Sequence, residues 1–180
     1  MKLVILDRDG VINQDSATFI KNPNEWIPIP GSLEAIALLN QRGYRVAIAT
    51  NQSGIARGYF DMATLNAIHE KMHKAVAQVG GRIDAVFYCP HAADDHCNCR
   101  KPKTGMIEEI GLRFNLELNK VAGVGDALRD LQAFAKAGCQ PYLVRTGKGE
   151  ETYNLADVPP NTIVVADLAA AVQDIIAGDK

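Results

Sequence analysis

Residues 3–12 read Leu-Val-Ile-Leu-Asp-Arg-Asp-Gly-Val-Ile, so an apolar run stops abruptly at two acids, Asp7 and Asp9, with Gly10 behind them. A buried strand rarely ends in paired acids unless a positive charge lies beside them. Side chains two residues apart on an extended chain point the same way, and such carboxylates repel unless a cation neutralises them. Mg²⁺ prefers oxygen ligands and keeps phosphate oxygens in its shell. The stretch therefore predicts a strand that ends at a magnesium ion and a phosphate group; the alternative is a strand followed by an Asp-Gly turn.

The size and composition of the chain limit the classes of protein to consider. Its 180 residues, 47% of them hydrophobic, suffice for a real core, so we expect residues 1–180 to form a single domain. The formal net charge is −2 and acids and bases are interspersed, which disfavours nucleic acid as the main partner. The apolar stretch before Asp7 is too short for a signal peptide or a membrane span. We therefore expect a cytoplasmic protein without a membrane partner.

Strand-like and helix-like segments alternate along the chain. Buried strands are expected at residues 2–6, 44–50, 83–88, 120–124, 140–144 and 162–166. Helices are expected after the N-caps Ser32 and Asp61, over 106–114 and 128–137, and from Asp167 onward. Residues 146–161 are polar and contain proline, which indicates a surface connection. The alternation predicts an α/β fold with a Rossmann-like parallel sheet, helices on both faces, and a ligand site at the carboxyl ends of the strands.

Chemically active side chains follow four of the expected strands. In chain order these are Asp7 and Asp9; Thr50, Asn51, Gln52 and Ser53; Arg100 and Lys101; and Asp126 and Asp130. Each group alone has an ordinary alternative as a helix cap, a solvated cation or a turn residue. Because the carboxyl ends of parallel strands meet at one edge of a sheet, their joint occurrence predicts one site with acids, hydroxyls and a lysine.

These residues resemble the four motifs of the haloacid dehalogenase-like phosphatases. The matching motifs are Asp7-x-Asp9, Thr50, Lys101 and Gly125-Asp126-x-x-x-Asp130. The resemblance covers nearly the whole chain and implies a phosphoric monoester hydrolase that depends on Mg²⁺. The short chain leaves no room for a large cap domain, so an open site is expected.

The resemblance also implies a role for each motif. Asp7 would be the nucleophile that forms an aspartyl-phosphate, and Asp9 would protonate the leaving oxygen and then accept a proton from the attacking water. Thr50 and Lys101 would hold the phosphoryl oxygens, where charge gathers in the transition state. The implied magnesium ligands are the Asp7 carboxylate, the Asp9 backbone carbonyl and the Asp126 carboxylate, with Asp130 as a supporting group.

A second cluster of ligand-type residues lies between residues 89 and 101. Four of them, Cys89, His91, Cys97 and Cys99, supply three thiolates and one imidazole, which is a complete tetrahedral set for a structural zinc ion. His96 is a competing ligand, and reduced cysteines in a loop are the alternative to a metal site. The loop has little apolar content to order it, so zinc would fix the position of the residues that follow Cys99. Cys139 stands apart from the cluster and is expected in the core.

The cysteine loop narrows the resemblance to the branch that contains the D-glycero-D-manno-heptose-1,7-bisphosphate 7-phosphatases and the histidinol-phosphate phosphatases. The segments 7–13, 50–58 and 89–102 resemble the heptose enzymes closely. This resemblance implies a set of substrate-binding residues, namely Asn13, Asp15, Ser16, Asn51, Gln52, Ser53 and Arg100. The Arg100 guanidinium would reach the distal phosphate or the sugar hydroxyls. The heptose enzymes often have a lysine where this chain has Ala127, so the substrate contact of that lysine is not expected here.

The leading hypothesis is hydrolysis of the 7-phosphate of heptose 1,7-bisphosphate, in the synthesis of ADP-heptose, the lipopolysaccharide core or a related glycan precursor. Histidinol-phosphate phosphatase is the alternative enzyme, although its common bifunctional form carries a second dehydratase domain for which this chain is too short. A catalytically inactive phosphosugar-binding module would not need all of the matching residues. A polynucleotide phosphatase would need a basic groove, which the near-neutral composition does not offer. The expected partner is a small phosphosugar, and the expected state is a monomer.

Overall fold

The computed structural model describes residues 1–179 and contains one six-stranded parallel sheet. The strands are β1 (Lys2–Leu6), β2 (Tyr44–Asn51), β3 (Ala85–Cys89), β4 (Ala122–Gly125), β5 (Gln140–Val144) and β6 (Ile163–Val165). Their order across the sheet is β3-β2-β1-β4-β5-β6, so the first strand of the chain lies in the middle. Leu6, the last residue of β1, pairs with Ile48 on one side and with Val124 on the other. The predicted α/β fold with a parallel sheet is confirmed.

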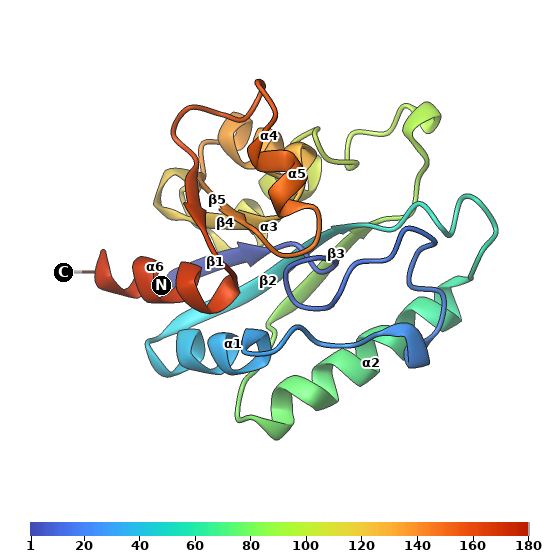
Figure 1. Ribbon diagram of the computed structural model, residues 1–180, viewed down its shortest axis with the longest axis horizontal. Coiled ribbons are helices and arrows are strands. Elements are labelled where there is room, and N and C mark those ends of the chain that lie inside the picture. Colours follow the sequence, from blue (N-terminus) through green and yellow to red (C-terminus); the bar gives the residue numbers. More distant parts are fainter. Residues whose placement is uncertain (180) are drawn as a thin grey trace.

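Helices cover both faces of the sheet. They are α1 (Ser32–Gln41), α2 (Met62–Gln78), α3 (Gly105–Phe114), α4 (Leu128–Ala137), α5 (Gly149–Tyr153) and α6 (Leu168–Ala177). Single 3₁₀ turns lie at Pro23–Glu25, Ala93–Asp95 and Leu118–Lys120. In Figure 1, α1 and α2 lie on one side of the sheet and α3 and α4 on the other. This arrangement leaves the carboxyl ends of the strands for the loops that carry the predicted site.

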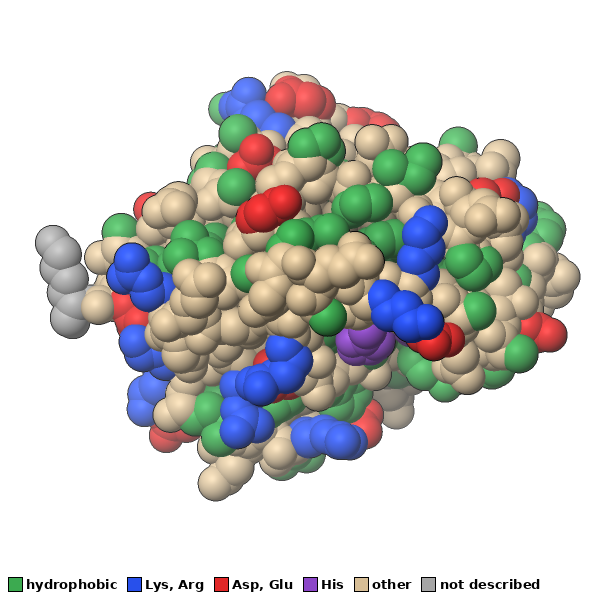
Figure 2. Space-filling view, turned by 90° about the horizontal axis from the view of Figure 1, so that it is seen from below, with side chains coloured by type: hydrophobic (Ala, Val, Ile, Leu, Met, Phe, Trp, Pro, Cys, Tyr) green, Lys and Arg blue, Asp and Glu red, His purple; other side chains and the backbone are tan. Residues whose placement is uncertain are grey.

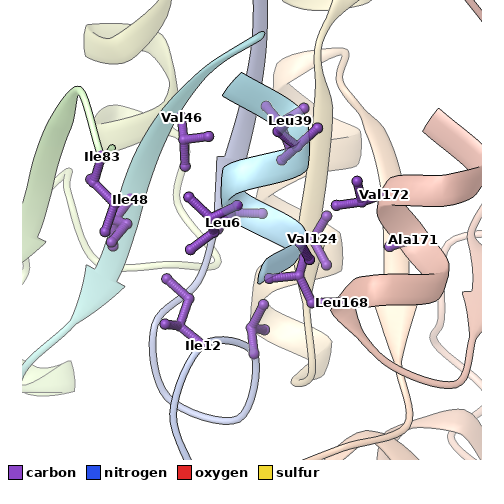
Figure 3. Packing of buried hydrophobic residues seen from close by; sticks show 14 of the residues in the cluster. Leu6, Ile12, Leu39, Val46, Ile48, Ile83, Val124, Leu168, Ala171 and Val172 are labelled. Carbon is purple, nitrogen blue, oxygen red and sulfur yellow. The ribbon is translucent and has the colours of Figure 1, made fainter. Parts of the chain in front are cut away.

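The core consists of two apolar clusters, one on each face of the sheet. Leu6, Val46 and Ile48 point to one face, where they meet Leu39 of α1 and Val172 of α6 (Figure 3). The alternate residues of the same strands point to the other face and pack against α3 and α4; this cluster includes Leu3, Ile5, Ala47, Met106, Ile107, Ile110 and Phe134. Cys139 belongs to this second cluster, as predicted. Strands that are buried on both faces read as continuous apolar runs, which explains why they could be found in the sequence.

Two local predictions were wrong. Ser32 does not cap α1 but is its first residue; its hydroxyl donates to the Val11 carbonyl at 2.8 Å, and Gly31 takes the cap position with φ of +87°. Residues 146–161 are not only a surface connection, because they contain α5 and contact the predicted site. Both errors have one cause: the deciding contacts are with distant parts of the chain, which no local pattern records.

The surface gives two further observations. On the face shown in Figure 2, basic side chains lie in separate groups among acidic ones, without a continuous basic stripe across this face. Among residues 1–179, no helix has the length and apolarity needed to cross a bilayer.

Candidate active site

Two aspartates follow neighbouring strands at the carboxyl edge of the sheet. Asp7 comes directly after β1, and Asp126 comes directly after β4. The backbone N–H of Asp7 donates to the Val124 carbonyl at 2.9 Å, which extends the pairing of the two strands by one residue. As a result, carboxylate oxygens of Asp7, Asp126 and Asp130 lie within 4.8 Å of one another. The predicted convergence of acids at this edge is therefore present.

Two glycines allow the backbone to approach the Asp126 carboxylate. A Cβ atom on Gly10 would lie 2.0 Å from Asp126 Oδ2, and one on Gly147 would lie 2.3 Å from the same atom. Both glycines have positive φ, +81° and +57°, which residues with a side chain rarely adopt. The Lys148 N–H donates to Asp126 Oδ2 at 2.9 Å, and the Thr146 hydroxyl donates to the Gly10 carbonyl at 2.7 Å. The segment after β5 thus encloses the acid cluster.

The carboxylates of Asp7, Asp126 and Asp130 are buried close together, so their negative charges repel one another. Burial, together with the charge of Asp130, raises the pKa of Asp7 to about 7. Burial and the charges of Asp130 and Asp7 raise the pKa of Asp126 to about 9. Carboxylates with raised pKa values at this spacing, with only oxygen donors between them, fit a hard divalent cation such as Mg²⁺.

Lys101 supplies the one buried ammonium beside these acids in the part of the chain that the structure describes. Its Nζ atom lies 3.0 Å from Asp7 Oδ1, 2.8 Å from Asp130 Oδ1 and 2.6 Å from the Ala49 carbonyl. Burial disfavours the charge, but Asp130 and Asp7 outweigh it and raise the pKa of Lys101. Asn51 fixes the lysine backbone, since its Oδ1 accepts from the Lys101 N–H and its Nδ2 donates to the Lys101 carbonyl. A positive charge is thus held beside Asp7.

Asp130 supports this arrangement without facing the cavity. Its side chain is fully buried, and Oδ2 accepts the backbone N–H groups of Asp126 at 3.2 Å and Ala127 at 3.0 Å. Burial opposes its ionisation, but Lys101 and Arg129 hold the pKa of Asp130 below its usual range. The first turn of α4 therefore carries a carboxylate that orients both Lys101 and the loop of Asp126.

Asp9 is held as a carboxylate by three donors. Arg8 Nε and Asn13 Nδ2 each lie 2.9 Å from Asp9 Oδ1, and Gln52 Nε2 lies 3.1 Å from Oδ2. Burial opposes its ionisation, but the Arg8 guanidinium and the bonds from Asn13 and Gln52 lower the pKa of Asp9. Gln52 also donates to the Thr50 hydroxyl at 2.9 Å, so one amide connects the two motifs.

A cavity of about 220 Å³ opens at this edge of the sheet. Four acidic residues line it, Asp7, Asp9, Asp15 and Asp126, together with five basic ones, Arg57, Arg100, Lys101, Arg129 and Lys148. Of the predicted substrate-binding residues, Asp15, Ser16, Asn51, Ser53 and Arg100 line the cavity. Asn13 and Gln52 are buried and bond to Asp9 instead, so their direct contact with substrate stays a prediction.

Six cavity residues were missed in the sequence: the apolar Ala17, Phe19 and Ile20 and the basic Arg57, Arg129 and Lys148. Arg129 is the most informative, because it stands two positions after Ala127, which is buried and offers no polar side chain. The Nε atom of Arg129 is buried without a hydrogen-bond partner in the described structure. Burial opposes its charge, but Asp130, Asp7 and Asp126 raise its pKa. The only signal for Arg129 in the sequence was its place between Asp126 and Asp130.

The cysteine loop folds into a compact ligand cluster beside Lys101. Cys89 Sγ lies 3.5 Å from His91 Nδ1 and 3.6 Å from Cys97 Sγ, and His91 Nδ1 lies 3.3 Å from Cys99 Sγ. The four ligand atoms all lie within 4.8 Å of one another, so they could hold one metal ion. His96 is exposed and lies outside this set. The observed cluster contains the four predicted residues, and a set of three sulfurs and one nitrogen suits zinc.

Comparisons with known proteins agree with this geometry. Residues 2–148 match the family model described as polynucleotide kinase 3 phosphatase. The D-glycero-beta-D-manno-heptose-1,7-bisphosphate 7-phosphatase of Bordetella bronchiseptica is 58% identical over 98% of both chains. A crystal structure of D,D-heptose 1,7-bisphosphate phosphatase from the same species, complexed with magnesium and phosphate, superposes with a TM-score of 0.97 at 57% identity and 99% coverage of both chains.

More distant structures share the fold alone. A HAD-superfamily hydrolase from Ehrlichia chaffeensis has a TM-score of 0.62 at 16% identity, over 92% of this chain and 65% of its own. A parallel sheet with paired aspartates, a buried lysine and a further aspartate at its carboxyl edge defines a phosphatase of the haloacid dehalogenase-like class. More narrowly, the chain belongs to the family of the D-glycero-beta-D-manno-heptose-1,7-bisphosphate 7-phosphatases.

Proposed function

We propose that this enzyme hydrolyses the 7-phosphate of D-glycero-D-manno-heptose 1,7-bisphosphate through an aspartyl-phosphate on Asp7. The observation that carries the proposal is the buried contact of Asp7 with Lys101, next to Asp126, in a chain that is 58% identical to a named enzyme of this activity. The names of several relatives specify the β anomer, so we propose the β anomer for this chain as well.

In the first half of the reaction, a carboxylate oxygen of Asp7 attacks the phosphorus atom of the 7-phosphate. The bond between phosphorus and the sugar oxygen breaks, and Asp9 supplies the proton that this oxygen takes up. Lys101, together with the hydroxyls of Thr50 and Ser53, compensates the charge that develops on the phosphoryl oxygens. The carboxylate is a weak nucleophile, so most of the rate enhancement comes from placement and charge compensation.

In the second half, a water molecule attacks the phosphorus atom of the aspartyl-phosphate and gives its proton to Asp9. The bond between phosphorus and Asp7 breaks, which restores the carboxylate and releases inorganic phosphate. Asp9 must therefore alternate between a protonated and an ionised form. Asn13 and Gln52, which bond its two oxygens, support the ionised form.

Two metals are proposed to assist these residues. The carboxylates of Asp7 and Asp126 and the backbone carbonyl of Asp9 would hold Mg²⁺, which when bound offsets the repulsion between nucleophile and phosphate. Cys89, His91, Cys97 and Cys99 would hold a structural Zn²⁺ that fills all its positions with protein ligands. The zinc loop of residues 89–101 then fixes Lys101, the phosphate-binding cation.

The basic residues that line the cavity suit a substrate with two phosphates. Lys101 serves the phosphate that is transferred, which leaves Arg57, Arg100 and Arg129 for the one that remains. We propose that Arg100 and Arg129 bind this second phosphate, since a guanidinium can bind phosphate through two parallel hydrogen bonds. A histidinol phosphate carries an amine in place of the second phosphate, and three arginines in one cavity disfavour that substrate.

The remaining alternatives fit less well. A polynucleotide substrate suits the name of the matching family model, but the relatives that match along the full length are named heptose phosphatases. An inactive binding module would not require the buried pair of Lys101 and Asp7. A cytoplasmic location and a monomeric state stay proposals, supported by the soluble phosphosugar substrate and by a site that is complete within one chain.

Phosphate release from a panel of substrates tests the proposed function. With saturating Mg²⁺, we expect kcat/KM for heptose 1,7-bisphosphate to exceed that for fructose 1,6-bisphosphate and for histidinol phosphate by at least about a hundredfold. A higher value for histidinol phosphate would replace the proposed substrate. Absence of phosphate release from every substrate would favour the binding module.

A further inference from the structure

A fully buried arginine, Arg8, stands between the two proposed catalytic aspartates in the sequence. The Arg8 side chain has no exposed surface, whereas 24% of the Asp9 side chain is exposed. Nε donates to Asp9 Oδ1 at 2.9 Å, and Nη2 lies 2.8 Å from the same oxygen as an ion-pair contact without hydrogen-bond geometry. A guanidinium is expensive to bury, so each of its contacts has to be accounted for. The third nitrogen, Nη1, contacts a different residue.

The partner of Nη1 is a histidine from a distant helix. His69 lies on the buried side of α2 with Leu65, Ile68 and Met72, and its Nε2 atom is 3.1 Å from Arg8 Nη1. An arginine can only donate hydrogen bonds, so Nε2 must be the acceptor and the imidazole must be neutral, with its proton on Nδ1. Burial and the charge of Arg8 lower the pKa of His69 to about 3, which keeps the ring neutral at ordinary pH.

The contact sets the direction of the Arg8 guanidinium. Asn13 and Gln52, the other donors to Asp9, are each held by a second bond, to the Gln14 carbonyl and to the Thr50 hydroxyl. Arg8 is the only one of the three donors that carries a charge, and His69 is the group that fixes it from outside the active-site loops. A shift of Arg8 would therefore move the Asp9 carboxylate, and small displacements of a group that transfers a proton are costly.

We propose that His69 is a positioning residue, which through Arg8 holds Asp9 in line with the leaving oxygen. The proposal rests on the proposed function only in taking Asp9 as the group that protonates this oxygen. It predicts that loss of the His69 acceptor impairs the departure of poor leaving groups and affects good ones little. A purely structural role for His69 would instead lower activity on all substrates together.

The test compares three variants on two kinds of substrate. His69→Leu removes the acceptor at similar volume, His69→Gln places an amide oxygen near the position of Nε2, and His73→Leu is the matched control one turn further along α2, where the side chain is exposed. The poor leaving group is a sugar alkoxide, tested with heptose 1,7-bisphosphate, and the good one is p-nitrophenolate, tested with p-nitrophenyl phosphate. Zinc content and Tm of each variant report on the fold.

We expect His69→Leu to lower kcat/KM for the bisphosphate by roughly ten- to a hundredfold, and for p-nitrophenyl phosphate by about threefold at most. His69→Gln should recover most of the loss on the bisphosphate. An equal loss on both substrates, or no loss on either, would overturn the proposal. If His69→Leu fails to fold, His69→Asn, whose amide is too short to reach Arg8, takes its place with the same expected outcomes.

The experiment distinguishes a wrong substrate assignment from a wrong role for His69. If wild-type protein cleaves fructose 1,6-bisphosphate but not the heptose compound, the substrate proposal fails, and the same comparison of leaving groups is made with the fructose compound. The positioning role then stands or falls on the ratio of the two losses alone.

Discussion

The Nζ atom of Lys101 lies 2.8 Å from Oδ1 of Asp130, and neither side chain is more than 1% exposed. The pair joins the zinc loop to the first turn of α4, so two segments of the site are fixed by one contact. Lys101 also contacts Asp7 Oδ1 at 3.0 Å, so removing the Asp130 charge would leave the lysine with one carboxylate partner in place of two.

We expect Asp130→Asn to lower the free energy of unfolding by about 1.5–3 kcal/mol, because a hydrogen-bonded charge pair is lost while Lys101 keeps Asp7. Urea unfolding followed by circular dichroism measures this loss. The matched control is Asp167→Asn, because Asp167 caps α6 through the Ala170 N–H and makes no ion pair with any of residues 1–179. Its expected change is within about 1 kcal/mol, since asparagine caps helices well. Equal losses for the two variants would show that the ion pair has little effect on stability.

Asp7→Asn should abolish phosphate release and preserve the fold. An amide oxygen does not accept a phosphoryl group as a carboxylate does, and the neutral side chain removes the cost of a buried acid near Asp130. Steady-state phosphate release at saturating Mg²⁺ measures activity, and Tm and zinc content measure the fold. A variant that keeps more than about 1% of wild-type kcat would exclude Asp7 as the nucleophile.

Purified protein should contain one zinc ion per chain. Cys97→Ser should lose zinc during dialysis against a chelator and should lose activity, because Lys101 follows the metal loop directly. Elemental analysis and the phosphate assay are made on the same samples. Cys139→Ala is the control, since this thiol is buried elsewhere in the core, and it should keep both zinc and activity. Full activity in a zinc-free preparation would contradict the proposed role of the loop.

Alanine substitutions of the neighbours Arg100 and Lys101 should affect activity on bisphosphates and monophosphates differently. Arg100→Ala should lower kcat/KM for a bisphosphate by about ten- to a hundredfold more than for a monophosphate, since only the bisphosphate has a second anionic group. Lys101→Ala should lower both values alike, because the transferred phosphate is common to both substrates. The control is Arg42→Ala, an exposed residue before the amino end of β2. Equal effects of Arg100→Ala on both substrates would remove its role in specificity.

Binding of Mg²⁺ should depend on pH. In metal-free protein the pKa of Asp7 is raised to about 7 and that of Asp126 to about 9, mainly by burial. Stability from the protonated forms is present at low pH and is lost as pH rises through these values, whereas metal binding requires the ionised forms. The rise in Tm caused by saturating Mg²⁺ should therefore increase between pH 6 and pH 9. The increase should be smaller in Asp126→Asn, and a rise in Tm independent of pH would contradict the assignment.

The sequence predicted the parts of the molecule that depend on residues close together in the chain. The buried strands are continuous apolar runs, and the proposed catalytic acids stand at their ends, so the sheet and the positions of Asp7 and Asp126 could be found from pattern alone. The Cys/His cluster proposed to bind zinc could be found because four rare residues are close together in the sequence. Contacts between distant segments could not be predicted from local sequence patterns. The hydrogen bond from Thr146 to Gly10 joins residues 136 positions apart, and the contact between Arg8 and His69 joins residues 61 positions apart.

The central position of β1 has a consequence for how the enzyme is made. The strand that carries Asp7 is synthesised first, yet it needs β2 on one side and β4 on the other. Contacts between segments far apart in the chain form late, because closing long loops costs entropy. Hydrolytic activity should therefore return only in the last cooperative step of refolding, after most secondary structure has formed. The rate at which phosphate release is recovered would then measure completion of the native sheet.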